Sequence, residues 1–198
     1  STAQVLEAFG HGFTCVTHLY SSCSMVRRNG PFREGGVVEA AYLLDGMDVE
    51  AIADGVHLPP ELLRLIYRVK GPERIALVTD AIRPGAMEVP EGAVMYDDKE
   101  HKRAIIIESG VAVMPDRKSF AGSIATTSRL VYTMTKAAEV PLHIAVRMAS
   151  LTPARIVGLD GVTGSIARGK RADLLLFDEE IRVKLVMVSG EIAYGGRR

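Results

Sequence analysis

Three side chains of the types that bind metals or transfer protons stand at the ends of short apolar segments. They are His18, His57 and Asp80. Histidine is a common metal ligand and general base, and aspartate is a common general acid or base. Taken singly, His18 could be a core histidine, His57 a surface residue and Asp80 a helix N-cap. Three such residues, each closing an apolar segment, together favour a functional site.

The segments that carry these residues have the composition of buried strands. Residues 13–20, 49–55 and 74–81 are short and mostly apolar, which is typical of parallel strands covered on both faces. Residues 37–44 and 61–71 lie between them and have apolar side chains at helical spacing. The alternation of strand and helix predicts an α/β fold with a parallel sheet. The carboxyl ends of such strands are where α/β barrels place their chemistry.

The other helices and one loop are also predicted from local patterns. Further helices are expected at residues 2–9, 120–140, 141–150 and 151–159. Ser123 is a plausible N-cap for the helix at 120–140. Residues 21–36 are rich in Ser, Gly and Arg without apolar periodicity, so a loop is predicted there.

Two regions have β character outside the parallel sheet. Residues 85–118 alternate short β-prone pieces with turns, which indicates a hairpin-like insertion. Three short strands are predicted near the C-terminus, at 172–177, 182–188 and 191–194. They are compatible with a small sheet beside the main domain.

Composition narrows the function classes. The chain has 24 basic and 24 acidic residues and no net charge, so no overall field attracts nucleic acid or anionic lipid. No apolar run has the length that a bilayer requires, and residues 1–10 lack the pattern of a signal peptide. Two cysteines, Cys15 and Cys23, are too few for a disulfide framework. We therefore expect a cytoplasmic protein that binds neither nucleic acid nor membrane.

Six motifs, in chain order, carry a resemblance to a known family. They are THLYSSCS, ADGVHL, LVTDA, FAGS, MASLTPA and GSIARGKRADLLLFD. In this order they resemble the N-acetylglucosamine-6-phosphate deacetylases of the amidohydrolase superfamily, over essentially the whole chain. The last motif is shared with dihydroorotases and ureases. ADGVHL and LVTDA, preceded by THL, are more specific to the sugar deacetylases.

The resemblance implies a fold and an activity. Residues 1–158 would form the C-terminal half of a metal-dependent (β/α)₈ barrel, with the insertion near 85–118. Residues 159–198 would supply strands of a small β-sandwich domain. The implied reaction is hydrolysis of the acetamide of N-acetylglucosamine 6-phosphate to glucosamine 6-phosphate and acetate. A homodimer and a phosphorylated amino sugar as the small-molecule substrate are expected.

The resemblance also implies roles for individual residues. Asp80 would be the catalytic acid/base, His18 a ligand to a divalent metal (Zn or Fe), and His57 a contact to the sugar. Residues Phe120, Ala121 and Gly122 of FAGS would line the sugar and acetyl side of the substrate pocket.

The implied phosphate site contains a departure from the family. Arg33, in PFREGG, matches the family's phosphate-binding arginine, and a guanidinium suits bidentate phosphate contact. Arg27 and Arg28 are alternatives for the same role. Ser21 and Ser22 replace an Asn-Ala pair whose backbone N–H groups bind phosphate in the family. The replacement keeps the backbone donors but loses the Asn side chain, so the identity of the sugar stays open.

The implied metal site is incomplete within these residues. The family's first histidine ligand belongs to a GHS-type motif expected just before Ser1, and its glutamate ligand is expected further upstream. His11 lies between glycines and does not match either ligand. Two alternatives therefore stand beside the deacetylase prediction. One is a related amidohydrolase for another N-acyl sugar or a cyclic amide, and the other is a non-catalytic fragment that needs a partner chain.

Overall fold

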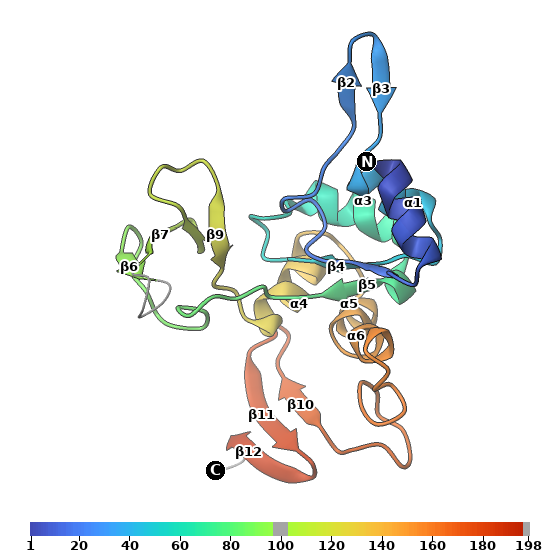
Figure 1. The fold of residues 1–198 in the computed structure, drawn as a ribbon. Helices are drawn as coiled ribbons and strands as arrows, with labels where there is room; N and C mark the ends of the chain where they lie inside the picture. The colour runs from blue at the N-terminus through green and yellow to red at the C-terminus, as the bar shows by residue number, and fades with distance from the viewer. Residues whose placement is uncertain (97–102, 196–198) are drawn as a thin grey trace.

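The centre of the molecule is a three-stranded parallel sheet. The computed structural model describes residues 1–96 and 103–195. Strands β1 (Cys15–Val16), β4 (Asp48–Ala51) and β5 (Ile75–Leu77) pair in the order β1-β4-β5 (Figure 1). The predicted parallel α/β arrangement is confirmed, although each strand is shorter than its apolar segment. The described residues do not form a closed barrel, so the (β/α)₈ architecture stays a prediction.

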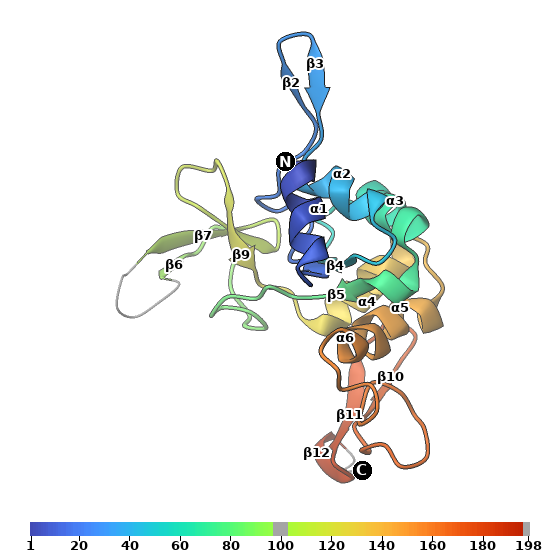
Figure 2. The ribbon, with the colours of Figure 1, turned by 45° about the vertical axis from the view of Figure 1, so that its right-hand side comes forward.

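Helices cover the parallel sheet. They are α1 (Thr2–Gly10), α2 (Val37–Leu43), α3 (Pro60–Lys70), η1 (Pro72–Arg74), α4 (Thr127–Lys136), α5 (Leu142–Ala149) and α6 (Leu151–Ile156). Helices α1 and α3 lie above β4 and β5, and α5 and α6 lie below them, in both ribbon views (Figures 1 and 2). The core between these layers is apolar, and among its fully buried side chains are Leu19, Met47, Leu63, Ile66, Ile75, Leu130 and Met148. No helix of the described residues is long and apolar enough to cross a membrane.

Helix α3 shows how the sequence sets the helix boundaries. Pro60 opens it, where the missing N–H costs no hydrogen bond. Leu63 and Ile66 face the core from one stripe. Gly71 ends the helix with a φ of 69°, which glycine adopts without steric cost.

The predicted insertion forms an antiparallel sheet of four strands. Its strands are β6 (Val94–Tyr96), β7 (Ala104–Glu108), β8 (Val111–Val113) and β9 (Phe120–Ser123), paired in that order. Ile105, Ile107 and Ala112, from β7 and β8, form a small core separate from the main one. Residues 97–102 of the predicted insertion lie outside the described residues. The division of the chain into domains at 158 and 159 stays a prediction.

The sheet corrects the helix predicted for residues 120–140. Phe120–Ser123 is strand β9, because its backbone pairs with β8. Ser123 is therefore not the N-cap. Helix α4 begins after Thr126, whose side chain accepts a hydrogen bond from the N–H of Arg129.

A hairpin corrects the loop predicted for residues 21–36. Strands β2 (Arg27–Asn29) and β3 (Phe32–Glu34) pair across Gly30-Pro31 and project from the top of the molecule (Figure 1). Gly30 has a φ of 59°, the conformation that such turns favour. The Asn29-Gly30 pair is a local hairpin signal, and the strands have no apolar periodicity because their side chains are largely exposed.

The three C-terminal strands occur as predicted. Strands β10 (Leu174–Phe177), β11 (Val183–Val188) and β12 (Glu191–Gly195) form an antiparallel sheet below α6 (Figure 2). Residues 196–198 lie outside the description. Membership of this sheet in a β-sandwich stays a prediction.

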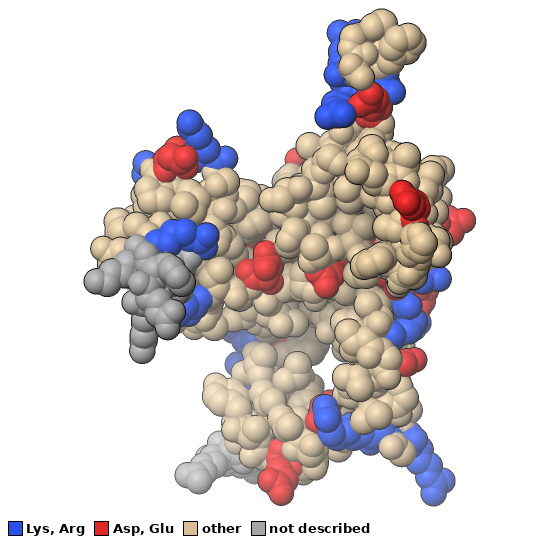
Figure 3. Space-filling view, in the orientation of Figure 1, with Lys and Arg blue, Asp and Glu red and all other residues tan. Residues whose placement is uncertain are grey.

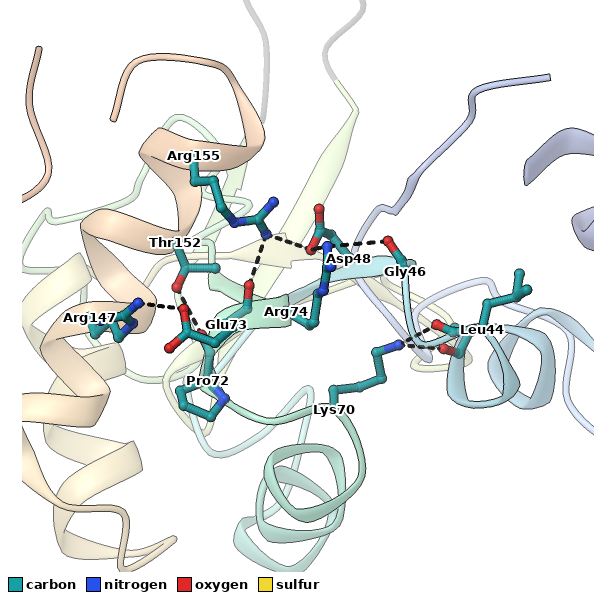
Figure 4. A network of polar contacts seen from close by, with 11 residues as sticks. Leu44, Gly46, Asp48, Lys70, Pro72, Glu73, Arg74, Arg147, Thr152 and Arg155 are labelled. Carbon is teal, nitrogen blue, oxygen red and sulfur yellow. Dashed lines mark hydrogen bonds and ion pairs between the residues drawn. The ribbon is translucent and has the colours of Figure 1, made fainter. Parts of the chain in front are cut away.

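A polar network joins the elements at the amino ends of the parallel strands (Figure 4). Asp48, at the start of β4, accepts hydrogen bonds from Arg74 at 3.2 Å and Arg155 at 2.6 Å. Lys70 donates to the carbonyl oxygens of Ala41 and Leu44, both at 2.8 Å, near the end of α2. Because this end of an α/β sheet carries stability and not chemistry, we interpret the network as structural.

Candidate active site

A cavity opens at the carboxyl ends of the parallel strands. Its volume is about 530 Å³. It is lined by His18, Tyr20, Ser21, Ser22, His57, Asp80, Val113, Arg117, Lys118, Ser119, Phe120, Ala121 and Gly122. The fold thus brings together every residue that the sequence assigned to the site except Arg33. One wall comes from the loops after β1, β4 and β5, and the other from strands β8 and β9 and the loop between them.

His18 lies two residues beyond β1 in an uncommon backbone conformation. Its φ is 30°, and such strain in a non-glycine residue costs about 1–3 kcal/mol and often marks a functional site. The carboxylate of Glu50 accepts hydrogen bonds from the Thr17 hydroxyl at 2.7 Å and the His18 N–H at 3.4 Å. Glu50 therefore holds this turn from the neighbouring strand.

The imidazole of His18 has the properties expected of a metal ligand. Its Nδ1 atom is buried and has no hydrogen-bond partner among the described residues. A buried polar atom without a partner is costly, and coordination would satisfy it. Within residues 1–96 and 103–195, no group of three or more His, Cys, Asp or Glu side chains could hold a metal ion. The chain thus offers His18 as one ligand of the kind that Zn²⁺ or Fe²⁺ accepts.

Asp80 lies three residues beyond β5 and is exposed to the cavity. Its φ is 47°, a second strained conformation at a strand end. The following residues pair with β9 and do not begin a helix, since Ala81 bridges to Ser123. The helix-cap interpretation of Asp80 is therefore wrong. Asp80 thus lies where a molecule bound in the cavity would contact it.

Gly122 allows β9 to approach Asp80 closely. The Ser123 N–H donates to the backbone oxygen of Asp80 at 3.1 Å. A Cβ atom on Gly122 would lie 2.6 Å from Cγ2 of Ile82, and Gly122 has a φ of 132°. Only glycine fits both requirements. The close approach of FAGS therefore places Phe120 and Ala121 in the cavity wall beside Asp80.

Asp54 is a buried partner of His57 that the motifs did not point to. Its side chain and that of His57 are 2% and 3% exposed, and Asp54 Oδ2 lies 2.7 Å from His57 Nδ1. Asp54 Oδ1 accepts the backbone N–H groups of Val56 at 2.9 Å and His57 at 2.8 Å. The ring of His57 also packs against Phe120, with centroids 4.3 Å apart. The position of Asp54 inside ADGVH was the available signal.

The charge on Asp54 sets the tautomer of His57. Burial raises the pKa of Asp54, but the hydrogen bonds from the His57 ring and the Val56 N–H outweigh burial and hold the pKa below its usual range. An ionised carboxylate accepts hydrogen bonds only, so Nδ1 of His57 carries the proton. This leaves Nε2 as the nitrogen available to a ligand.

The loop after His18 lines the cavity with Tyr20, Ser21 and Ser22. Tyr20 and Ser22 have φ values of 76° and 55°. The Ser21 N–H donates to the His18 carbonyl at 2.9 Å, whereas the Ser22 N–H has no acceptor among the described residues. Successive N–H groups in such a turn form concave sites that suit anions.

Arg33 lies apart from this cavity. It belongs to β3 of the projecting hairpin and is exposed, with Arg28 as its cross-strand neighbour. Arg27 forms an ion pair with Glu34 at 2.9 Å. The cations that line the cavity are instead Arg117 and Lys118, which carried no motif in the sequence.

The sequence model of the Amidohydrolase family matches residues 2–193 of this chain. The chain belongs to this family. Among curated relatives, the N-acetylgalactosamine-6-phosphate deacetylase of Shewanella sp. (strain ANA-3) is 32% identical over 96% of this chain and 45% of the relative. The N-acetylglucosamine-6-phosphate deacetylase of Vibrio furnissii is 31% identical, with the same coverages of 96% and 45%. The resemblance stated from the motifs is thereby confirmed.

Solved structures give the same result for the fold. The N-acetylglucosamine-6-phosphate deacetylase from Thermotoga maritima matches with a TM-score of 0.86 and 28% identity, over 98% of this chain and 50% of that one. A mutant of the Mycobacterium smegmatis enzyme, in complex with N-acetyl-D-glucosamine-6-phosphate, matches with a TM-score of 0.83 and 33% identity, over 97% and 48%. The chain thus spans about half the length of these amidohydrolases.

Proposed function

We propose that this amidohydrolase chain belongs to an enzyme that hydrolyses the acetamide of N-acetylglucosamine 6-phosphate to glucosamine 6-phosphate and acetate. One observation carries the proposal. His18, His57 and Asp80 come from three different strand ends and line one cavity. The names of the relatives support the substrate class.

His18 would hold a divalent metal together with ligands from outside the described residues, because catalytic sites use about three protein ligands. Bound there, a Zn²⁺ or Fe²⁺ ion would supply Lewis-acid activation of water and of the acetamide carbonyl. The unpartnered Nδ1 of His18 supports this role.

Asp80 would move the proton. Its carboxylate takes a proton from water as the water oxygen bonds to the acetamide carbon. It then gives the proton to the amide nitrogen as the C–N bond breaks, which releases acetate and the free amino sugar. One carboxylate that is open to the cavity can perform both transfers in turn.

His57 and Phe120 would orient the sugar. The Asp54 carboxylate fixes the His57 ring, and Phe120 supplies an apolar surface beside it. A hydroxyl of the sugar would donate to Nε2 of His57. Ala121 and Gly122 would complete the wall on the acetyl side.

The phosphate would lie near Ser21 and Ser22. The free N–H of Ser22 supports this placement. Arg33 does not line the cavity of its own chain, so its contribution would require a homodimer in which the hairpin of one copy reaches the cavity of another. The exposed Phe32 at 73% and Val26 at 54% give the hairpin apolar surface to bury in such a contact.

Acetate release from N-acetylglucosamine 6-phosphate tests the function. The experiment uses the complete enzyme, meaning this chain together with the segment that carries the other metal ligands. Asp80→Asn should lower kcat by about 10²–10⁴-fold while substrate still binds, because an amide cannot exchange the proton. Asp160→Asn, at an exposed turn, is the matched control and should keep full activity. If Asp80→Asn keeps more than about a tenth of the wild-type kcat, Asp80 is not the acid/base.

Mixing two inactive variants tests the role of Arg33. An Arg33→Ala copy and an Asp80→Asn copy should each be impaired alone. In mixed dimers, one of the two cavities would have both Arg33 from its neighbour and an intact Asp80, so activity should return in part. No recovery on mixing would show that Arg33 does not act across an interface.

A second candidate substrate is the 4-epimer, N-acetylgalactosamine 6-phosphate. It is favoured by the 32% identical relatives from Shewanella and Escherichia coli O157:H7, which carry that name. Comparing kcat/KM for the two epimers decides between them. A cyclic amide is less favoured, since it offers nothing to a phosphate site. The free thiols of Cys15 and Cys23 support a cytoplasmic location, where thiols stay reduced.

A further inference from the structure

The cavity has a local positive charge that comes from one loop. The loop of residues 114–119 joins β8 to β9, and its Arg117 and Lys118 both line the cavity. Asp80 is the acidic residue in the same lining. With histidines counted as neutral, the cavity lining therefore carries a net positive charge, although the net charge of the whole chain is zero. Any attraction for an anionic ligand must be local.

Hydrogen bonds hold this loop in place. The Met114 N–H donates to the Ser119 carbonyl at 2.9 Å, and the Arg117 N–H donates to the Met114 carbonyl at 2.8 Å. The Lys118 N–H donates to the carboxylate of Asp116 at 3.0 Å. The loop is thus closed on itself at the end of a paired hairpin. Its cations are attached to an ordered backbone, which lowers the entropy lost when they bind a ligand.

The two cations differ in what already neutralises them. Arg117 Nε donates to the carboxylate of Glu108 at 3.0 Å, so part of its charge is compensated. The ammonium of Lys118 has no hydrogen bond or ion pair with any residue in the described ranges, 1–96 and 103–195. Lys118 is therefore the lining cation that a ligand can engage without breaking an existing pair.

We propose that Lys118 contacts the phosphate of the substrate and so adds to the preference for phosphorylated amino sugars that Ser21 and Ser22 begin, with Arg117 in a lesser role. The proposal rests on the proposed function and deepens it. The acetamide and hydroxyl groups of an amino sugar are neutral, so the phosphate is the group that a cation recognises. An ammonium is a compact charge that binds phosphate oxygens well. Lys118 lines the cavity of its own chain, together with Asp80, whereas Arg33 would have to reach the cavity of another copy.

Kinetics of the complete enzyme on N-acetylglucosamine 6-phosphate and on N-acetylglucosamine test this role. Lys118→Met keeps the apolar stem and removes the charge. It should raise KM for the phosphorylated sugar by about tenfold, and change KM for the unphosphorylated sugar by less than about twofold. The kcat values should stay near wild type, because Lys118 holds a group remote from the reacting bond. Lys118→Arg should restore most of the loss, since it restores the charge.

A matched control separates local contact from net charge. Lys136→Met removes the same charge from α4, where Lys136 pairs with Glu180 at 3.5 Å outside the cavity lining. It should leave both KM values unchanged. Raising the ionic strength from about 0.05 to about 0.5 M should raise KM for the phosphorylated sugar in the wild type more than in Lys118→Met, because salt screens an exposed charge pair.

The outcomes distinguish this proposal from the function on which it rests. If the wild type prefers the phosphorylated sugar and Lys118→Met keeps that preference, the role of Lys118 is refuted and the function stands. Equal losses on both sugars would also refute it, since they would show a structural role. If the wild type cleaves neither sugar, the proposed function is wrong. Calorimetric binding of inorganic phosphate to the wild type and to Lys118→Met then tests the contact on its own. About tenfold weaker phosphate binding in Lys118→Met would support the contact, and unchanged binding would overturn it.

Discussion

The substitution Asp54→Asn should destabilise the protein and misplace His57 at the same time. Asp54 is 1% exposed and accepts three hydrogen bonds, from the Val56 N–H, the His57 N–H and His57 Nδ1. Asparagine has nearly the same shape but no charge, and it presents an NH₂ group where Asp54 has a second oxygen. Facing that NH₂ group, His57 would have to give up the proton on Nδ1 and carry it on Nε2.

The magnitude follows from these three bonds. A hydrogen bond to a charged group contributes about 1.5–3 kcal/mol and a neutral one about 1 kcal/mol. Converting three charge-assisted bonds to neutral ones should therefore lower the free energy of unfolding by about 2 kcal/mol. Asp54→Ala would leave the buried donors of Val56 and His57 unpaired, so its loss should be larger, about 3–5 kcal/mol.

The pH dependence has a definite sign. The folded-state pKa of Asp54 is lowered below its ordinary value of 3.8. The stabilisation that this shift provides is fully present above the ordinary pKa and is lost as pH falls toward the folded-state pKa. The difference in unfolding free energy between wild type and Asp54→Asn should therefore be constant from about pH 7 to 5 and shrink below about pH 4.

Urea-induced unfolding of the complete enzyme, followed by circular dichroism at several pH values, measures these quantities. Steady-state kinetics should show a raised KM, because the Nε2–H tautomer can no longer accept a hydrogen bond from the sugar. A loss below about 0.5 kcal/mol, or a difference that does not shrink in acid, would refute the reasoning. Unchanged KM with the expected instability would show that Asp54 supports the fold without orienting His57.

Two further predictions separate stability from function. Gly122→Ala should lower the free energy of unfolding by about 2 kcal/mol and should also lower kcat/KM, because the new Cβ would lie 2.6 Å from Ile82 and push β9 away from Asp80. Gly110→Ala is the control, since Gly110 also has a positive φ but open space around its Cβ. It should cost less stability and leave the kinetics unchanged. Asp48→Asn should lower the free energy of unfolding by about 1–3 kcal/mol, because it weakens the hydrogen bonds from Arg74 and Arg155. It should leave kcat and KM unchanged, because Asp48 lies at the end of the strands opposite to the cavity. Thermal unfolding and acetate release measure the two effects, and a changed KM would contradict the structural interpretation.

The surface shows why long-range electrostatics contributes little to these predictions. On the visible face, basic and acidic side chains are interspersed over the hairpin, the antiparallel sheet and the C-terminal region, and no single sign covers this face (Figure 3). Selectivity must therefore come from a few close contacts, such as those assigned to Lys118 and to the N–H of Ser22.

The sequence by itself determined the parallel strands, most helices and the position of His18, His57 and Asp80 beyond three strand ends. These follow from local rules, because apolar segments bury themselves and a polar residue that ends such a segment must lie at the sheet edge. The C-terminal strands were equally predictable from their alternation with turns. For FAGS, the local pattern gave the wrong element, since pairing with β8 outweighed helix propensity.

Only the tertiary structure decided which residues share the cavity. Asp54 is identified as the partner of His57 by its burial and its three hydrogen bonds, and not by its spacing in the sequence. Arg33 and Lys118 are both cations in polar stretches of the sequence, and no local pattern tells them apart. The hairpin carries Arg33 away from the strand ends, while the β8–β9 loop carries Lys118 to them. Such placement depends on long-range pairing and packing, which a single sequence does not encode in any window of neighbouring residues.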